Sequence, residues 1–109
     1  MTTMVRPAKT AKSLAKRHDA ALRALRNEID RLDTEMLRLM TRRARLALQV
    51  GQVKKRDGRR VFDPERERRV LQRMVDANRG PLSATAIERI YREIIRQHRR
   101  LAQLAIIAR

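Results

Sequence analysis

Residues 25–54 read LRNEIDRLDTEMLRLMTRRARLALQVGQVK, and this stretch decides the fold. Apolar side chains recur within it and just before it at spacings of three and four, which is the spacing of one face of an α-helix. These positions are Leu22, Leu25, Ile29, Leu32, Met36, Leu39, Met40, Leu46, Ala47, Val50 and Val53. No proline interrupts the run, so the sequence predicts a single helix from about residue 18 to residue 56.

Such a helix would be roughly 55–60 Å long at the usual rise per residue. The rest of a 109-residue chain cannot cover an apolar stripe of that length. Part of the stripe therefore needs a second copy of the chain, which predicts a homodimer. Gly51 weakens the helix locally by up to about 1 kcal/mol, and it permits a close helix crossing.

A loop is expected over residues 55–60, with Gly58 as its clearest breaker. Asp63 is a natural N-cap and Pro64 fits the first helical position, so a second helix is predicted from there to about Asn78.

Gly80-Pro81 ends this segment, and Ser83 is expected to cap a third helix. Its apolar positions are Ile87, Ile90, Tyr91, Ile94, Ile95, Leu101 and Leu104. Because no segment shows the alternation of a strand, the predicted fold is all-α, with a long, a short and a medium helix in each protomer.

Residues 1–16 are basic, contain no acid and show no sustained period, so they are expected to form a disordered tail. Residues 17–109 would form the helical domain. An amphipathic mitochondrial presequence is an alternative interpretation of the tail. The chain ends soon after the third helix, so no second catalytic domain is expected.

The chain carries 28 basic and 12 acidic residues, a formal charge of +16, which favours an anionic partner: a nucleic acid, a membrane surface or a small acid. It has no cysteine, which excludes a disulfide framework and a thiolate metal site. It contains no apolar run of the roughly 20 residues that a membrane span needs, and no secretory signal. A cytoplasmic protein without membrane association is expected.

Three basic residues of the first helix fall on or beside its apolar stripe, where a lone cation would be costly to bury without an anion. Arg43 and Lys54 are eleven residues apart, so they lie about 20° apart around the helix and roughly 16 Å along it. Both can reach the ends of one small ligand. Arg26 lies about 260° around the helix from Arg43 and roughly 25 Å along it. It would join that pocket only from the partner of an antiparallel dimer. The simpler interpretation is that all three are surface cations.

A second cluster, Asp63, Arg66 and Glu67, opens the second helix. Glu67 can accept a ligand hydroxyl while Arg66 faces a carboxylate. The simpler interpretation is that Asp63 caps the helix. The negative charge of Glu67 would then interact favourably with the helix dipole, or pair with a nearby arginine. His98 falls on the inward face of the third helix, where a histidine is more often a core or interface residue. A pocket of several cations and one or two acids suggests a ligand that carries carboxylates and a hydroxyl.

No Ser/His/Asp arrangement, HExxH motif, phosphate-binding glycine loop or metal-ligand cluster is present in the sequence. No metal site is therefore expected, and catalysis would have to use positioning and electrostatics.

Over residues 22–104 the sequence resembles the all-helical class of chorismate mutases. The first helix matches at Arg26, Ile29, Leu32, Asp33, Leu39, Arg43, Val50, Gly51 and Lys54. The segment VFDPERE at residues 61–67 matches the second motif, V-x-D-P-x-R-E, and the third is Tyr91 followed by Ile94-Ile95. The resemblance implies intertwined homodimers with two composite sites. It also implies conversion of chorismate to prephenate by a Claisen rearrangement, in aromatic amino acid biosynthesis and without a cofactor.

By this resemblance, the partner's Arg26 and Arg43 would hold the carboxylates of chorismate. Lys54 would donate to the ether oxygen and to a carboxylate. At the other end, Glu67 would accept the ring hydroxyl, helped by Asp63 and Arg66. The clamp would also select the compact, chair-like conformer of the substrate.

The last helix departs from the family pattern, which usually places a small polar residue and, one turn later, a Gln or Glu that contacts the ether oxygen. Here these positions are His98 and Ala102, and Gln103 comes one residue late, about 100° away. Gln103 could reach the site through a helix irregularity, His98 could supply the donor, or the site could be weakened or repurposed. We expect His98 or Gln103 to compensate.

Three alternatives remain open. Isochorismate pyruvate-lyase shares the carboxylate clamp, but the loop between Lys54 and Asp63 is of the longer, mutase-like kind. A nucleic-acid-binding dimer fits the charge, but only two aromatic residues could stack on bases and no recognition module is present. A non-catalytic dimer that regulates another shikimate-pathway enzyme fits the missing Gln.

Overall fold

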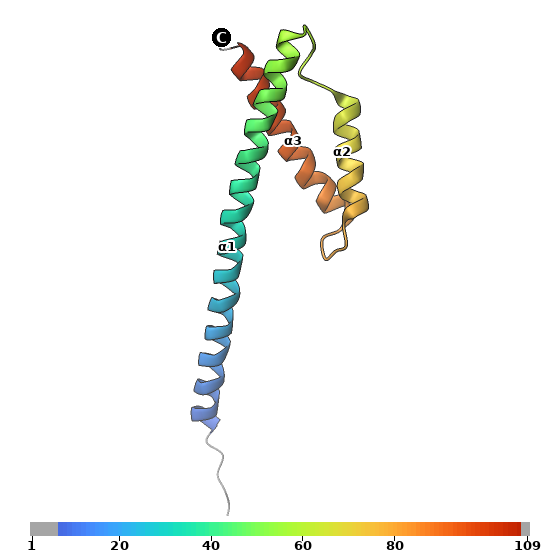
Figure 1. The fold of residues 1–109 in the computed structure, drawn as a ribbon. Helices are drawn as coiled ribbons and strands as arrows, with labels where there is room; N and C mark the ends of the chain where they lie inside the picture. The colour runs from blue at the N-terminus through green and yellow to red at the C-terminus, as the bar shows by residue number, and fades with distance from the viewer. Residues whose placement is uncertain (1–6, 108–109) are drawn as a thin grey trace, which may run out of the picture. The chain divides into compact units, whose positions relative to one another are not determined.

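The computed structural model describes residues 7–107, which form three helices and no strand. They are α1 (Pro7–Arg56), α2 (Pro64–Ala77) and α3 (Ala84–Ile107) (Figure 1). The predicted all-α fold and its order of long, short and medium helix are confirmed. The chain forms two compact units that divide between Leu39 and Met40.

The first unit holds α1 up to Leu39, and every side chain described in it, from Thr10 onward, is exposed. Its apolar stripe is therefore uncovered within one chain; it includes Leu22, Leu25, Ile29, Leu32, Met36 and Leu39. This is the uncovered surface from which the sequence predicted a second copy.

The helix α1 begins at Pro7, earlier than the predicted start near residue 18. The expectation of a disordered tail is therefore not met for residues 7–16, and residues 1–6 lie outside the described part of the chain. The physical reason is composition: proline suits the first turn of a helix, and residues 8–16 are mostly alanine, lysine and leucine, which are good helix formers. The domain boundary near residue 17 stays a prediction.

The second unit contains the end of α1, α2 and α3. The helices α2 and α3 pack side by side (Figure 1), and the best-buried apolar residues are Val70, Ile95 and Ala102. At Gly51, α1 crosses α3 so closely that an added Cβ would lie 3.2 Å from Cβ of Ala102 and 3.4 Å from Cδ1 of Ile106. The predicted close crossing at Gly51 is confirmed.

The predicted caps are also confirmed. Asp63 caps α2, because its carboxylate accepts from the backbone N–H of Arg66 at 3.0 Å. The Ser83 hydroxyl accepts from the backbone N–H of Ala86 at 3.1 Å, and α3 begins directly after it. Gly58 has a φ of 71°, a left-handed conformation that favours glycine, in the loop after α1.

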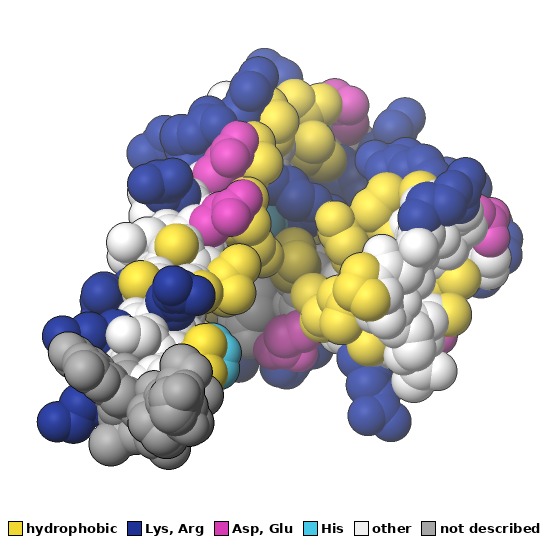
Figure 2. Space-filling model, turned by 90° about the horizontal axis from the view of Figure 1, so that it is seen from below, with side chains coloured by type: hydrophobic (Ala, Val, Ile, Leu, Met, Phe, Trp, Pro, Cys, Tyr) yellow, Lys and Arg dark blue, Asp and Glu magenta, His cyan; other side chains and the backbone are white. Residues whose placement is uncertain are grey.

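The described surface is strongly basic. Figure 2 shows Lys and Arg side chains over much of the visible face, with exposed hydrophobic side chains between them and few acids. No helix within residues 7–107 is both long enough and apolar enough to cross a membrane. In the same part of the chain, His, Asp and Glu residues form no group of three that could hold a metal ion.

Candidate active site

A cavity of about 250 Å³ lies in the second unit, between the end of α1, the loop before α2, and the facing sides of α2 and α3. Its apolar wall is formed by Ala47, Val50, Val61, Val70, Ile95 and Ala102. Its charged and polar lining consists of Arg43, Lys54, Asp63, Arg66, Glu67, His98 and Arg99. Six of these seven were predicted as site residues from the sequence, and the structure brings them together.

Lys54 connects α1 to the loop that precedes α2. Its Nζ donates to the carbonyl oxygen of Val61 at 3.3 Å and lies 3.9 Å from Oδ2 of Asp63. Only 19% of its side chain is exposed. An ammonium group has three donors, so these contacts fix its position and leave donor capacity for a ligand.

Arg43 and His98 form a hydrogen bond across the cavity wall, with Nη1 of Arg43 2.7 Å from Nδ1 of His98. A guanidinium can only donate, so Nδ1 of His98 must accept, and the ring proton lies on Nε2. Burial lowers the pKa of His98, and the charge of Arg43 lowers it further. This environment favours the neutral imidazole.

Burial is also the main cause that lowers the pKa of Arg43. Tyr91 opposes the shift, while Arg66 and Arg73 add to it. A guanidinium starts from so high a pKa that it remains charged. Arg43 is thus a partly desolvated cation among other cations, the environment in which an anionic ligand is favoured.

Glu67 pairs with an arginine that the sequence analysis did not single out. Nη1 of Arg99 donates to Oε1 of Glu67 at 2.6 Å, and the two side chains are only 25% and 22% exposed. The Arg99 guanidinium also lies 4.5 Å above the ring of Phe62. The signal that could have found Arg99 is its register, since it lies one helical turn after the buried Ile95.

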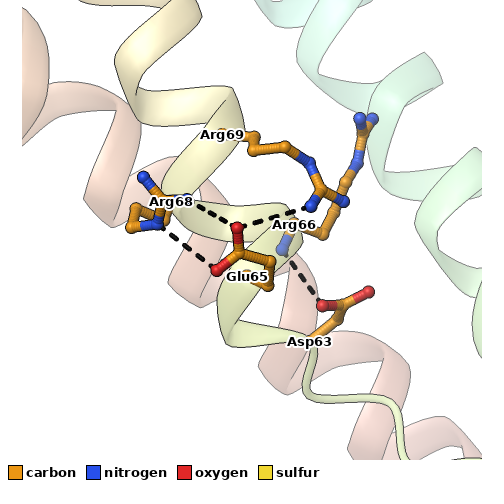
Figure 3. A network of polar contacts seen from close by, with 5 residues as sticks. All are labelled: Asp63, Glu65, Arg66, Arg68 and Arg69. Carbon is orange, nitrogen blue, oxygen red and sulfur yellow. Dashed lines mark hydrogen bonds and ion pairs between the residues drawn. The ribbon is translucent and has the colours of Figure 1, made fainter.

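Figure 3 shows two groups of polar contacts at the start of α2: Glu65 with Arg68 and Arg69, and Asp63 with the backbone N–H of Arg66. Glu65 pairs with Arg68 and, at 3.6 Å, with Arg69, and none of these three lines the cavity. Arg66 does line it, and among the described residues its guanidinium makes no ion pair. Arg66 is therefore available to an anion in the cavity.

Three other residues named from the sequence lie elsewhere or contribute little. Arg26 belongs to the first unit and is not part of the cavity lining. Gln103 lines a different cavity, beside Lys55 and Phe62, so the structure does not bring it to the site. Ala102 does line the site but offers only a methyl group, which is 2% exposed.

Comparisons with known proteins identify the family of this chain. The family model described as chorismate mutase type II matches residues 25–103. The chain is 41% identical over 78 residues to the bifunctional chorismate mutase/prephenate dehydratase of Aquifex aeolicus, covering 68% of this chain and 22% of that protein. It is 42% identical over 78 residues to the T-protein of Haemophilus influenzae, covering 71% and 21%. The chain thus spans about a fifth of the length of these curated relatives.

Two solved structures of chorismate mutase from Thermus thermophilus are similar to this one. Form II has a TM-score of 0.75 at 32% identity, over 76% of this chain and 94% of that one. Form I has a TM-score of 0.71 at 33% identity, over 72% and 98%. The matching helices, together with the family match over residues 25–103, lead to one conclusion: the chain belongs to the chorismate mutase type II family.

Proposed function

We propose that this protein converts chorismate to prephenate by a Claisen rearrangement, as a step of aromatic amino acid biosynthesis in the cytoplasm. The observation that carries the proposal is the charge of the cavity. Its lining holds four cations, Arg43, Lys54, Arg66 and Arg99, and two carboxylates, Asp63 and Glu67, which leaves a formal charge of +2. Chorismate carries two carboxylates, so the site and the ligand have matching charge.

Catalysis would use preorganised electrostatics. As the C–O bond breaks, negative charge develops on the ether oxygen, and a fixed donor aimed at that oxygen stabilises the transition state more than the substrate. Lys54 is suited to this role because the Val61 carbonyl and Asp63 fix its ammonium group. Arg43 and Arg66 would hold carboxylates and so select the conformer in which the reacting carbons approach. Glu67 would accept the ring hydroxyl.

The departure on α3 has a candidate compensation within the cavity. Ala102 offers no donor. With Nδ1 of His98 engaged by Arg43, Nε2–H of His98 becomes a donor without a partner among the described residues. We therefore assign to His98, rather than to Gln103, the role of replacing part of the missing contact.

The complete site would need a second copy of the chain. The exposed apolar stripe of the first unit supports a homodimer, because a stripe of this length is unfavourable in water. In such a dimer, the partner's Arg26 would add a further cation to each cavity. Sedimentation of the wild type would test this assembly, and Leu32→Lys, on the stripe, should weaken it.

The test of the proposed activity is prephenate formation from chorismate by the purified protein. Arg43→Ala should lower kcat/KM by about 100-fold or more, as expected for a residue that binds a carboxylate and holds the substrate in its reactive conformer. Arg45→Ala is the matched control, because Arg45 is exposed on the same helix and does not line the cavity. Release of pyruvate from isochorismate, without prephenate from chorismate, would assign the site to the lyase instead.

A further inference from the structure

Arg99 connects three segments that enclose the cavity. It projects from α3, its Nη1 lies 2.6 Å from Oε1 of Glu67 on α2, and its guanidinium stacks at 4.5 Å on Phe62 in the loop before α2. The cation–π contact holds the guanidinium over the ring, and the hydrogen bond directs one of its N–H groups toward Glu67. Arg99 is thus held in one orientation by two independent contacts.

The Glu67–Arg99 pair differs from the other ion pairs of α3. Arg96 pairs with Glu93 within the helix, and both side chains are about half exposed. Arg99 and Glu67 come from different helices, and their side chains are only 25% and 22% exposed. A pair that is exposed within one helix contributes little, whereas a desolvated pair between helices restricts both side chains.

The contact leaves half of the Glu67 carboxylate free. Arg99 bonds to Oε1, while Oε2 has no hydrogen-bond partner among the described residues. A carboxylate that is held through one oxygen presents the other in a fixed direction, which is the arrangement needed to accept from a ligand hydroxyl.

We propose that Arg99 is a positioning residue: it orients Glu67 so that the free carboxylate oxygen receives the substrate hydroxyl. This inference rests on the proposed function and deepens it. Phe62, whose ring lies under the Arg99 guanidinium, directly follows Val61, whose carbonyl accepts from Lys54. The same loop therefore supports both the hydroxyl end and the ether end of the site.

The test compares turnover of chorismate by Arg99→Gln, Arg99→Lys, Glu67→Gln and the double variant Arg99→Gln/Glu67→Gln, with Arg96→Gln as the control. Arg99→Gln should lower kcat/KM about tenfold, the equivalent of one hydrogen bond to a charged group. Arg99→Lys should recover part of that loss, and Arg96→Gln should behave as the wild type. Because Arg99 acts through Glu67, the double variant should be no slower than Glu67→Gln alone.

A second readout does not depend on turnover. NMR of the Arg99 guanidinium should show restricted rotation in the wild type and faster rotation in Glu67→Gln, because a neutral amide oxygen accepts more weakly than a carboxylate while the contact with Phe62 remains. If Arg99→Gln turns over like Arg96→Gln, or if the two losses simply add, the positioning role is overturned while the proposed function stands. If the wild type forms no prephenate, the proposed function fails. The NMR result then decides the inference, and rotation that Glu67→Gln leaves unchanged overturns it.

Discussion

The Arg43–His98 hydrogen bond makes the protein sensitive to pH in a way that two substitutions can isolate. His98→Ala removes the acceptor that Arg43 uses at 2.7 Å, whereas His98→Gln keeps an acceptor that does not titrate. A hydrogen bond to a charged group contributes about 1.5–3 kcal/mol, and the lower end applies because this site is part-buried. We expect His98→Ala to lower the free energy of unfolding by about 1.5 kcal/mol at neutral pH, and His98→Gln to lower it much less.

The sign of the pH effect follows from the lowered pKa of His98 in the folded protein, which burial and Arg43 cause. Between that pKa and the ordinary value of about 6.5, the unfolded chain binds more protons than the folded one. Stability therefore rises with pH across this window and falls as the pH drops below about 6.5. Protonated His98 can no longer accept from Arg43, so the loss approaches that of His98→Ala, about 1.5 kcal/mol.

The assay is urea unfolding followed by circular dichroism at several pH values from 7.5 to 5, at one protein concentration. The difference between the wild type and His98→Gln cancels the titration of other groups. That difference in unfolding free energy should grow as the pH falls. Over the same pH range, the kcat/KM of the wild type for chorismate should decrease. Parallel curves for the two proteins, or a His98→Gln as unstable as His98→Ala, would refute the reasoning.

Gly51→Leu should lower the free energy of unfolding by about 1–3 kcal/mol, because the added side chain meets Ala102 at the helix crossing. Urea unfolding against Gln52→Leu, an exposed neighbour expected within about 0.5 kcal/mol of the wild type, checks this. Asp63→Ala should cost about 1 kcal/mol through the lost cap, whereas Asp63→Asn should keep the stability and still lower kcat/KM, because only the charge beside Lys54 is lost. With its charge of +16, the protein should capture the chorismate dianion several-fold more slowly at about 0.15 M salt than at about 0.01 M, as stopped-flow kinetics would measure.

The helices could be predicted from the sequence because their signals are local. The caps Asp63 and Ser83 and the breaker Gly58 act within a few residues, and each lies where it was predicted. The start of α1 at Pro7 was missed because the stretch before residue 18 has no apolar stripe. Its helix rests on intrinsic propensity, which is a weaker signal than periodicity.

The lining of the site was predictable in kind but not in pairing. Charge and spacing made Arg43, Lys54 and Glu67 candidates and the family resemblance favoured them as site residues, but neither shows which side chains meet across helices. The bonds from Arg43 to His98 and from Arg99 to Glu67 join residues 55 and 32 positions apart. Such contacts depend on the helix crossing, which in turn depends on the small side chains at Gly51 and Ala102.

These pairings bear on how a site with a charge of +2 can exist before its ligand arrives. Arg43 has His98, Lys54 has Asp63 and Arg99 has Glu67, so three of the four cations in the lining already have a partner. Each partner offsets part of the cost of desolvating the cation and holds it in one place. Arg66, the fourth, is exposed and keeps its hydration until an anion replaces it. Under the proposed function, a substrate dianion would meet donors that folding has already oriented, so little reorganisation would be left for the chemical step.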